Sequence, residues 1–399
     1  MNILVFCDED LGVVGGGTMQ VVQFVRALAA RGHTLRIVAP RPSVGMEGHA
    51  TLNGVQGVWV WVPRVPMVRP WAYLIGSAIA LFWTMWREKP DVMLWFDSPG
   101  QVAPLICAGL MRRPYVLFVN GLPGEELTGH WRWKPILNVI QGALRVSGQR
   151  AQAVVSVCRE IPLWMQREWG VAADRCQVIR NGVDPSVCLP RQKADARHRL
   201  GLDHDGLYIG FVGGFFPWHG LDTLVEAMTM ICRECPVVKL LLVGDGHTRP
   251  ALQALVRQRG LEDAVSFVGR VGFEEVPWWI GASDVCVVLH RPVRFYPGDS
   301  MKLWEYLACA RPVIATAGEG YGDVVEKLGA GLSVKSDDPL ALAEGVLRVL
   351  RNPASAGKMG QAGRAAIVRS HTWDARAVEL EHVCRTVTAQ YQRDRVCAS

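Results

Sequence analysis

The stretch FYPGDSMKLWEYLACARPVIAT, from Phe295 to Thr316, decides the fold class of this chain. It places a short polar loop before an apolar helix and then a short buried β-run. Lys302 and Glu305 stand at the start of that helix. A carboxylate one turn into a helix, facing a loop of glycine and polar groups, suits a ribose better than a hydrophobic core. The stretch therefore predicts a nucleotide site in an α/β domain.

A second informative stretch is IGFVGGFFPWHGLDTLVEA, from Ile209 to Ala227. Its order of strand, glycine turn and helix is the way in which α/β proteins present backbone N–H groups to a phosphate. We expect the two stretches to form one nucleotide site together.

The length and periodicity of the chain indicate two domains. A chain of 399 residues is too long for one ordinary domain. Short β-rich runs alternate with longer helical ones, which is typical of repeated βα units and parallel sheets. A Pro-rich and charged run, PSVCLPRQKADARHRLGLDHDG, predicts the linker. We expect a first domain over residues 1–188, a second over 189–372, and a C-terminal helix over 373–399 that crosses back to the first domain.

Composition narrows the class of protein. The formal charge of +6 is spread along the chain, without a run of Lys or Arg dense enough to follow a nucleic-acid backbone. The eleven cysteines stand mostly inside apolar runs, which indicates reduced thiols in a cytosolic protein. Cys232 and Cys235 form a C-x-x-C without the second pair that a zinc site needs. Because MNILVFCDED begins directly as a strand, we expect no secretory leader and a cytoplasmic protein.

An uncharged segment from Trp71 to Trp86 is shorter than the roughly 20 residues that a spanning helix needs. It predicts a helix that is either buried or faces a membrane. Aromatic and basic side chains nearby suit an interfacial face at the inner side of the cell membrane, and packing in a core or a solvated helix start is an equally compatible interpretation. These side chains are Trp59, Trp61, Arg64, Arg69, Trp71 and the run Trp131–Lys134.

Glycine turns follow other predicted strands. Gly16 and Gly17 belong to a triple-glycine turn after the first strand, and Gly244 follows the strand over residues 239–243. The first turn is not G-x-G-x-x-G, and the second strand ends in Val-Ala-Pro-Arg without an acidic residue, so NAD binding is not expected. The P-loop pattern G-x-x-x-x-G-K-[ST] is also missing, so this is not a P-loop NTPase.

In their order and separation these motifs resemble the retaining glycosyltransferases of family 4. The resemblance runs through the GGG turn with LAARGHTLRIVAP, RNGVD, FVGGFFPWHGLDTLVEA, LLLVGDG, VSFVGR with EEVP, and KLWEYLACARPVIAT. It implies the GT-B fold, α/β with two Rossmann-like, doubly wound parallel-sheet domains facing across a cleft. In that family the donor nucleotide sugar lies mainly on the C-terminal domain, and the acceptor lies on the N-terminal side.

The resemblance also implies roles for residues of the first stretch, Phe295 to Thr316. Glu305 matches the glutamate that binds the donor ribose hydroxyls. A second family glutamate eight positions earlier is replaced by Pro297, so Asp299 or the backbone around Gly298–Met301 is expected to contact the donor sugar. Lys302 resembles a branch with P-x-K-L-x-E-Y, in which a cation sits near the diphosphate. Its plainer interpretation is a surface lysine on a first helical turn.

Two positions that are basic in many members of the family carry other residues in this chain. Gly214 and His219 stand where many members carry an arginine and a lysine that neutralise the leaving diphosphate. We expect His219 either to donate a hydrogen bond to phosphate or to pack beside Trp218. The glycine N–H groups and the helix dipole would then bind more of the anion.

Other positions follow from the same resemblance. Asn120 stands where members often have a histidine near the reacting carbon, and Arg270 stands where the nucleobase is recognised, with an exposed strand-end arginine as the alternative. Three residues in the next loop, Glu125, Glu126 and His130, are candidates for an acceptor-side base. The full predicted set is Asn120, His219 and Lys302 for catalysis, and Gly16, Gly17, Gly213, Gly214, His219, Gly244, Arg270, Asp299, Ser300, Met301, Lys302, Leu303 and Glu305 for the donor.

The sequence thus predicts a retaining glycosyltransferase that moves a sugar from a nucleotide-diphosphate sugar to a glycan, a lipid-linked acceptor or a small molecule. No D-x-D pair stands in a loop where it would hold Mg²⁺, so metal-independent chemistry without a cofactor is expected. Two alternatives stay open: a non-catalytic binding or scaffold protein derived from such an enzyme, and another enzyme of the same fold such as a sugar-nucleotide epimerase. Near-absent turnover with retained nucleotide binding would select the scaffold.

Overall fold

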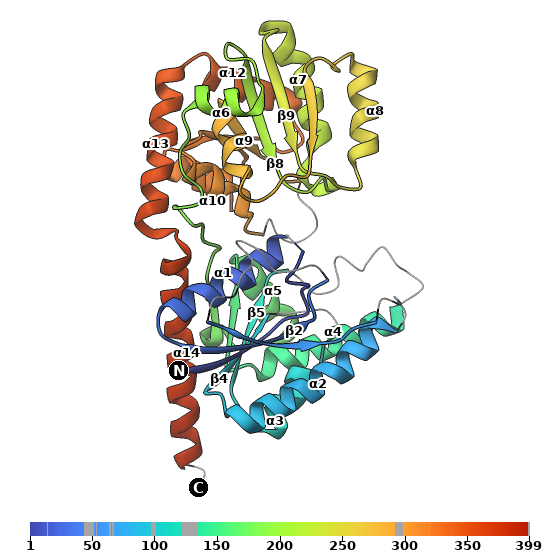
Figure 1. Ribbon diagram of the computed structural model, residues 1–399, viewed down its shortest axis with the longest axis vertical. Helices are drawn as coiled ribbons and strands as arrows, with labels where there is room; N and C mark the ends of the chain where they lie inside the picture. Colours follow the sequence, from blue (N-terminus) through green and yellow to red (C-terminus); the bar gives the residue numbers. More distant parts are fainter. Residues whose placement is uncertain are drawn as a thin grey trace. The chain divides into compact units, whose positions relative to one another are not determined.

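A computed structural model describes residues 1–13, 15–43, 52, 54–63, 65, 68–96, 101–121, 134–291, 298–318 and 320–397, with only the backbone described at 134–137, 139 and 140. The chain divides into two compact units, each drawn in Figure 1. The first contains Met1–Arg180 and Trp373–Ser399, and the second contains Asn181–Thr372.

The first unit is a seven-stranded parallel sheet in the order β3-β2-β1-β4-β5-β6-β7. The reversal of direction beside β1 makes it a doubly wound Rossmann-like sheet. All residues of β4 and β5 are buried because helices cover both faces, which is why these strands are continuous apolar runs. The strands are β1 Asn2–Phe6, β2 Thr34–Pro40, β3 Gln56–Val60, β4 Val92–Phe96, β5 Tyr115–Val119, β6 Ala153–Ser156 and β7 Cys176–Val178.

Helices of the first unit return the chain between neighbouring parallel strands. The C-terminal helix α14, Trp373–Cys397, lies against the first helix of this unit: Trp373 packs edge-on to Phe24 at 5.2 Å, and Arg31 forms an ion pair with Glu381. The red helix at the left of Figure 1 is this segment. The other helices are α1 Gly16–Ala30, α2 Arg69–Glu88, α3 Ala103–Leu110, α4 Lys134–Arg150 and α5 Glu160–Trp169.

The second unit is a six-stranded parallel sheet in the order β10-β9-β8-β11-β12-β13, again doubly wound. Its strands are β8 Leu207–Val212, β9 Val238–Val243, β10 Val265–Gly269, β11 Val285–Val288, β12 Val313–Thr316 and β13 Gly331–Val334. Its helices are α6 Lys193–Leu200, α7 Leu221–Glu234, α8 Arg249–Arg259, α9 Val276–Ala282, α10 Met301–Ala308, α11 Gly322–Lys327, α12 Pro339–Leu350 and α13 Pro353–Ser370. The two sheets confirm the predicted fold class.

The boundary between the units falls at Arg180, before the predicted boundary at residue 188. Tertiary contacts explain the difference. The Asn181 side chain donates a hydrogen bond to the carbonyl of Asp299 at 2.7 Å, and Cys188 is buried in the core under α10. These contacts tie residues 181–188 to the second unit, although the Pro-rich composition that predicts a linker begins only at Pro185.

No helix within the described ranges is both long enough and apolar enough to cross a bilayer.

Candidate functional site

Two glycine loops meet at the carboxyl edge of the second unit's sheet, after β8 and β9. The Gly213 amide donates to the Val243 carbonyl at 2.9 Å, and the Gly244 amide donates to the Gly269 carbonyl at 2.7 Å. Gly244 has a φ of +128°, and a methyl group there would collide with the Gly213 carbonyl oxygen. The loops therefore pack backbone against backbone, which only glycine permits.

Lys302 lies under the first of these loops. Its side chain is only 8% exposed, and its ammonium nitrogen sits 4.6 Å from the centre of the Phe211 ring. A Cβ atom on Gly213 would lie 2.9 Å from Lys302 Cε. The absent side chain of Gly213 thus makes the space that Lys302 fills, and the interpretation of Lys302 as a surface lysine is wrong because the residue is buried.

His219 forms a hydrogen bond with the Lys302 ammonium. Its Nδ1 is 2.6 Å from the Gly214 carbonyl oxygen and its Nε2 is 3.1 Å from Lys302 Nζ. Because a carbonyl only accepts, Nδ1 carries the proton and Nε2 offers its lone pair to the ammonium. Burial first, and then the Lys302 charge, lower the pKa of His219 to about 3. The ring is therefore neutral. The expectation that His219 donates to a phosphate does not fit, since both ring nitrogens are already engaged.

Glu305 lies one helical turn beyond Lys302 on α10. Its carboxyl is half-buried, and no donor within the described ranges forms a hydrogen bond with it. Burial raises the pKa of Glu305 to about 7, and the Lys302 charge opposes the shift. A partly buried carboxylate without donors costs free energy until a ligand supplies hydroxyl groups.

Burial lowers the pKa of Lys302 to about 7, against the opposing charge of Glu305. In the unfolded chain this lysine has its ordinary pKa of about 10.4. Between these values the unfolded chain binds a proton that the native state lacks, so this lysine makes the free energy of unfolding rise with pH. We expect the stability difference between the wild type and Lys302→Met to shift in favour of the wild type from pH 7 to 9.5, measured by urea unfolding. Lys335→Met, on a side chain 81% exposed, is the control and should show no such shift. An identical difference at both pH values for Lys302→Met would contradict the burial argument.

Asp299 is engaged in the protein itself. One carboxylate oxygen accepts from the Asn181 amide and the other accepts from the Trp304 indole at 3.1 Å. Asp299 is 9% exposed. The expected contact between this carboxylate and a donor sugar therefore does not fit, because its lone pairs join the start of the second unit to α10.

Three of the predicted donor residues after Asp299 differ in how accessible they are to a ligand. Ser300 is the N-cap residue of α10, and its side chain forms no hydrogen bond with the backbone amides of the first helical turn. Met301 is half-buried, whereas Leu303 is fully buried in the core cluster that packs around α10. Of this pair, only Met301 keeps exposed surface for a ligand.

Arg270 is exposed just after β10 and has no partner among the residues that the structure describes. Three other predicted residues lie in the first unit. Gly16 and Gly17 begin α1, and the Asn120 amide donates to Gln20 on that helix at 2.5 Å. Asn120 thus ties the end of β5 to α1. Four further predicted positions, Glu125, Glu126, His130 and Pro297, lie outside the described residues.

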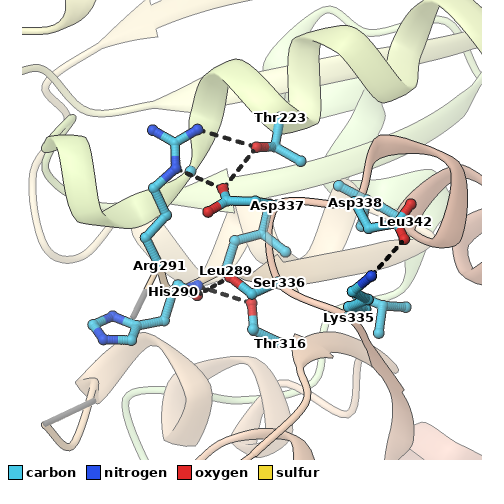
Figure 2. A pocket seen from close by; sticks show the side chains of 12 residues that line it. Thr223, Leu289, His290, Arg291, Thr316, Lys335, Ser336, Asp337, Asp338 and Leu342 are labelled. Atoms are coloured by element: carbon cyan, nitrogen blue, oxygen red, sulfur yellow. Dashed lines mark hydrogen bonds and ion pairs between the residues drawn. The ribbon is translucent and has the colours of Figure 1, made fainter. Parts of the chain in front are cut away.

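Sequence reasoning did not predict the Arg291 contacts that support the turn containing His219. The Arg291 guanidinium contacts Asp337 at 2.6 Å (Figure 2). It also contacts Asp222 at 2.6 Å, and the Arg291 backbone amide donates to the Trp218 carbonyl at 2.9 Å. These partners come from distant segments, so no local spacing announces them. The pocket in Figure 2, which Arg291 and Asp337 line, has a volume of ≈ 10 Å³, room for about one water and too small for a nucleotide sugar.

Metal ligands do not gather at this edge: within the described ranges no three His, Cys, Asp or Glu side chains are placed to hold a metal ion.

Two family models match the chain. Residues 14–187 match "Glycosyltransferase Family 4", and residues 206–352 match "Glycosyl transferases group 1". A D-inositol 3-phosphate glycosyltransferase from Frankia alni is 32% identical over 204 residues, which cover 48% of this chain and 49% of that protein. The chain thus spans about half the length of the first curated relatives it matches.

Solved structures share the whole fold. The sucrose-phosphate synthase of Thermosynechococcus elongatus has a TM-score of 0.78 at 22% identity, covering 98% of this chain and 99% of that one. Anabaena Alr3699/HepE in complex with UDP-glucose has a TM-score of 0.73 at 17% identity, covering 98% and 100%. At these identities the likeness shows the fold alone, which is GT-B.

Proposed function

Because this chain belongs to the GT-B glycosyltransferases, with a family 4 domain followed by a group 1 domain, we propose that it transfers a sugar from a nucleotide-diphosphate sugar to a hydroxyl acceptor with retention of anomeric configuration. The observation that carries the proposal is the buried Lys302 ammonium, held by His219 beside two glycine loops and one turn from Glu305.

Lys302 is proposed to stabilise the leaving diphosphate. The bond between the anomeric carbon and the phosphate oxygen breaks, and negative charge grows on that oxygen. A preorganised cation in a site that excludes water stabilises such charge strongly. His219 acts as a positioning residue, because its Nε2 fixes the ammonium and its Nδ1 is fixed by Gly214. One cation then serves where the family commonly uses two.

Glu305 is proposed to accept hydrogen bonds from the donor ribose. Its carboxylate lacks a donor in the described part of the chain and is therefore ready for two vicinal hydroxyl groups. Arg270 is proposed to lie at the nucleobase, since it is exposed at the end of a strand on the same sheet edge and has no partner in the described part of the chain. The sugar contact is proposed to come from the backbone around Gly298–Met301, since the Asp299 carboxylate is occupied.

The acceptor hydroxyl is proposed to attack the face that the diphosphate leaves. A new bond forms between the acceptor oxygen and the anomeric carbon, and the acceptor proton passes to the departing phosphate oxygen. This route needs no enzymic nucleophile, so positioning and charge stabilisation supply the rate enhancement. It also needs no divalent metal, since Lys302 and backbone N–H groups would meet the diphosphate. The acceptor class is proposed to be a lipid-linked glycan at the inner face of the cell membrane.

A thermal-shift titration tests the donor site directly. The purified chain is heated with UDP, GDP, ADP, TDP and their common sugar conjugates, each with and without EDTA, because stabilisation follows ligand affinity. We expect a base-selective rise in melting temperature that survives EDTA. UDP is the first nucleotide to try, because the Anabaena relative of this fold is described in complex with UDP-glucose. A rise that EDTA abolishes would contradict metal-independent binding. No rise with any nucleotide would overturn the donor site.

A second assay separates a transferase from a non-catalytic scaffold. Release of the nucleoside diphosphate is followed over time, with NMR of the transferred or hydrolysed sugar to read its anomeric configuration. Retention is the expected result. Nucleotide binding without turnover would select the scaffold.

A further inference from the structure

The helix α2 carries its large apolar side chains on the side that the fold leaves uncovered. Six of them, Trp71, Ile75, Ile79, Phe82, Trp83 and Trp86, are between 45% and 67% exposed. At about 100° per residue they fall within an arc of roughly 120° on one side of the helix. We call these six residues the α2 face.

The buried side of the same helix is the more polar one. Tyr73, Ser77 and Thr84 are turned inward together with Leu81 and Met85. The Tyr73 hydroxyl donates to the Cys7 carbonyl at 2.6 Å, and Ser77 and Thr84 donate to carbonyls of the helix itself. An ordinary surface helix has the reverse arrangement. Folding of the first unit therefore leaves unburied the apolar surface that this helix carries.

The neighbouring helix α3 extends this surface. It packs against α2, with the Cys107 thiol 3.5 Å from the Ala78 carbonyl, and exposes Ile106 and Leu110 at i, i+4 spacing. The tryptophan of β3, Trp59, does not join it. Val60 faces α2, because a Cβ on Gly76 would lie 2.7 Å from it, so Trp59 points to the other side of the sheet. The expected grouping of Trp59 with Trp71 is therefore wrong.

The exposed charges that border the α2 face are positive. Arg69 and Arg87 are about five turns apart on α2, which puts both on the same edge of the apolar arc. Lys89 follows α2 and Arg112 follows α3, and both are exposed. Parallel strands make these two helices run in the same direction, so their C-terminal cations meet at one end. Two carboxylates lie nearby: Glu88 contacts Arg36 and Arg87 and so offsets part of the Arg87 charge, and Asp91 accepts from the Asn2 amide. The cations outnumber these carboxylates, so the border stays positive.

We propose that the α2 face is a docking surface for an anionic lipid bilayer. The helix lies flat in the interface with its tryptophans at headgroup depth, while the arginines meet lipid phosphate. A second copy of this chain fits less well, because a two-fold contact would bring the same positive borders together. The α2 face is a contiguous group of exposed apolar side chains, whereas a monomer normally exposes such side chains singly.

Co-sedimentation with lipid vesicles tests the proposal. The full chain is mixed with vesicles of phosphatidylcholine alone, or of phosphatidylcholine with a quarter phosphatidylglycerol, at low and high salt. We expect binding to the anionic vesicles that weakens with salt and is poor without phosphatidylglycerol. The double variant Ile79→Glu with Trp83→Glu should bind at least about tenfold more weakly, because it puts two charges into the apolar arc.

A matched pair of variants controls for added charge. Leu163→Glu with Leu340→Glu alters side chains that are 59% and 57% exposed, similar to Ile79 and Trp83, but that belong to α5 and α12 instead of α2. This control should bind vesicles like the wild type, and both double variants should keep the wild-type melting temperature because every altered side chain is exposed.

Three outcomes would overturn the docking surface. The first is that the wild type does not bind anionic vesicles at low salt, and the second is that the α2 variant binds them as well as the wild type does. The third is that sedimentation velocity shows a wild-type dimer that the α2 variant does not form, which would assign the surface to a second copy. Vesicle binding requires neither donor nor turnover. If the chain does not bind vesicles but nucleotides still raise its melting temperature, the transferase proposal therefore remains valid.

Discussion

Lys302→Met is expected to lower kcat for sugar transfer by about 100- to 1,000-fold, the usual effect of removing one group that stabilises developing negative charge. The methionine keeps an unbranched side chain of similar length under Gly213 and over Phe211 but carries no charge. Because the charge on the departing phosphate grows during bond cleavage, kcat should fall much more than KM rises. Initial rates of nucleoside diphosphate release over a range of donor concentrations measure both quantities.

Stability cannot explain that loss. Burying an ammonium costs free energy, so Lys302→Met should unfold at the wild-type temperature or above it. Lys335→Met is the matched variant, since the same charge is removed from an exposed side chain of the same unit, and it should keep wild-type kinetics. A Lys302→Met enzyme that retains more than about a third of wild-type kcat would remove Lys302 from the proposed mechanism.

Glu305→Ala is expected to weaken binding of the nucleoside diphosphate by about 1.5–3 kcal/mol, the scale of hydrogen bonds to a charged group. The reason is that this carboxylate has no donor in the described part of the chain, so its hydrogen-bonding capacity is available to the ribose. Isothermal titration with the nucleotide that gives the largest melting shift measures the change. A 2′,3′-dideoxy nucleotide should bind the wild type and Glu305→Ala equally, because it lacks the hydroxyl groups in question.

Two controls accompany this variant. Glu344→Ala removes an exposed glutamate of the same unit and should leave the affinity unchanged. The pH dependence supplies the second: because burial raises the pKa of Glu305 to about 7, its carboxyl is largely protonated below that pH, and the affinity difference between the wild type and Glu305→Ala should shrink as pH falls through it. Unchanged affinity in a folded Glu305→Ala protein, with the dideoxy nucleotide still binding more weakly than its parent, would place the ribose elsewhere.

The local pattern of the chain predicted the elements of the site well. The switch from a β-run to glycine and then to a helical period located β8, the loop at Gly213 and α7. The same reasoning located α10 and β12 around KLWEYLACARPVIAT. It did not predict β7, because Cys176–Val178 is short and mostly exposed, with neither alternation nor an apolar run to reveal it.

Roles within the site were predicted less well. For His219 two roles were expected, a hydrogen bond to phosphate or packing beside Trp218; its ring nitrogens bind Gly214 and Lys302, and its ring lies edge-on to Trp218 at 6.1 Å. Asp299 was one of two candidates for the sugar contact, with the backbone around Gly298–Met301 as the other, and its carboxylate oxygens bind Asn181 and Trp304. Each side chain has a chemistry that suits a ligand or a protein partner equally, and the choice depends on what the fold places next to it.

The sequence by itself determined two βα domains, the sheet edges that carry glycine loops, and the helix that presents Lys302 and Glu305. These follow from backbone sterics and from apolar periodicity, both of which act between residues near one another in the chain. Only the tertiary structure decided that Lys302 is buried against His219, that Arg291 braces the histidine turn, and that α2 turns its apolar side outward. The physical reason is that burial, pKa and hydrogen-bond partners depend on groups from distant segments, which no local spacing records.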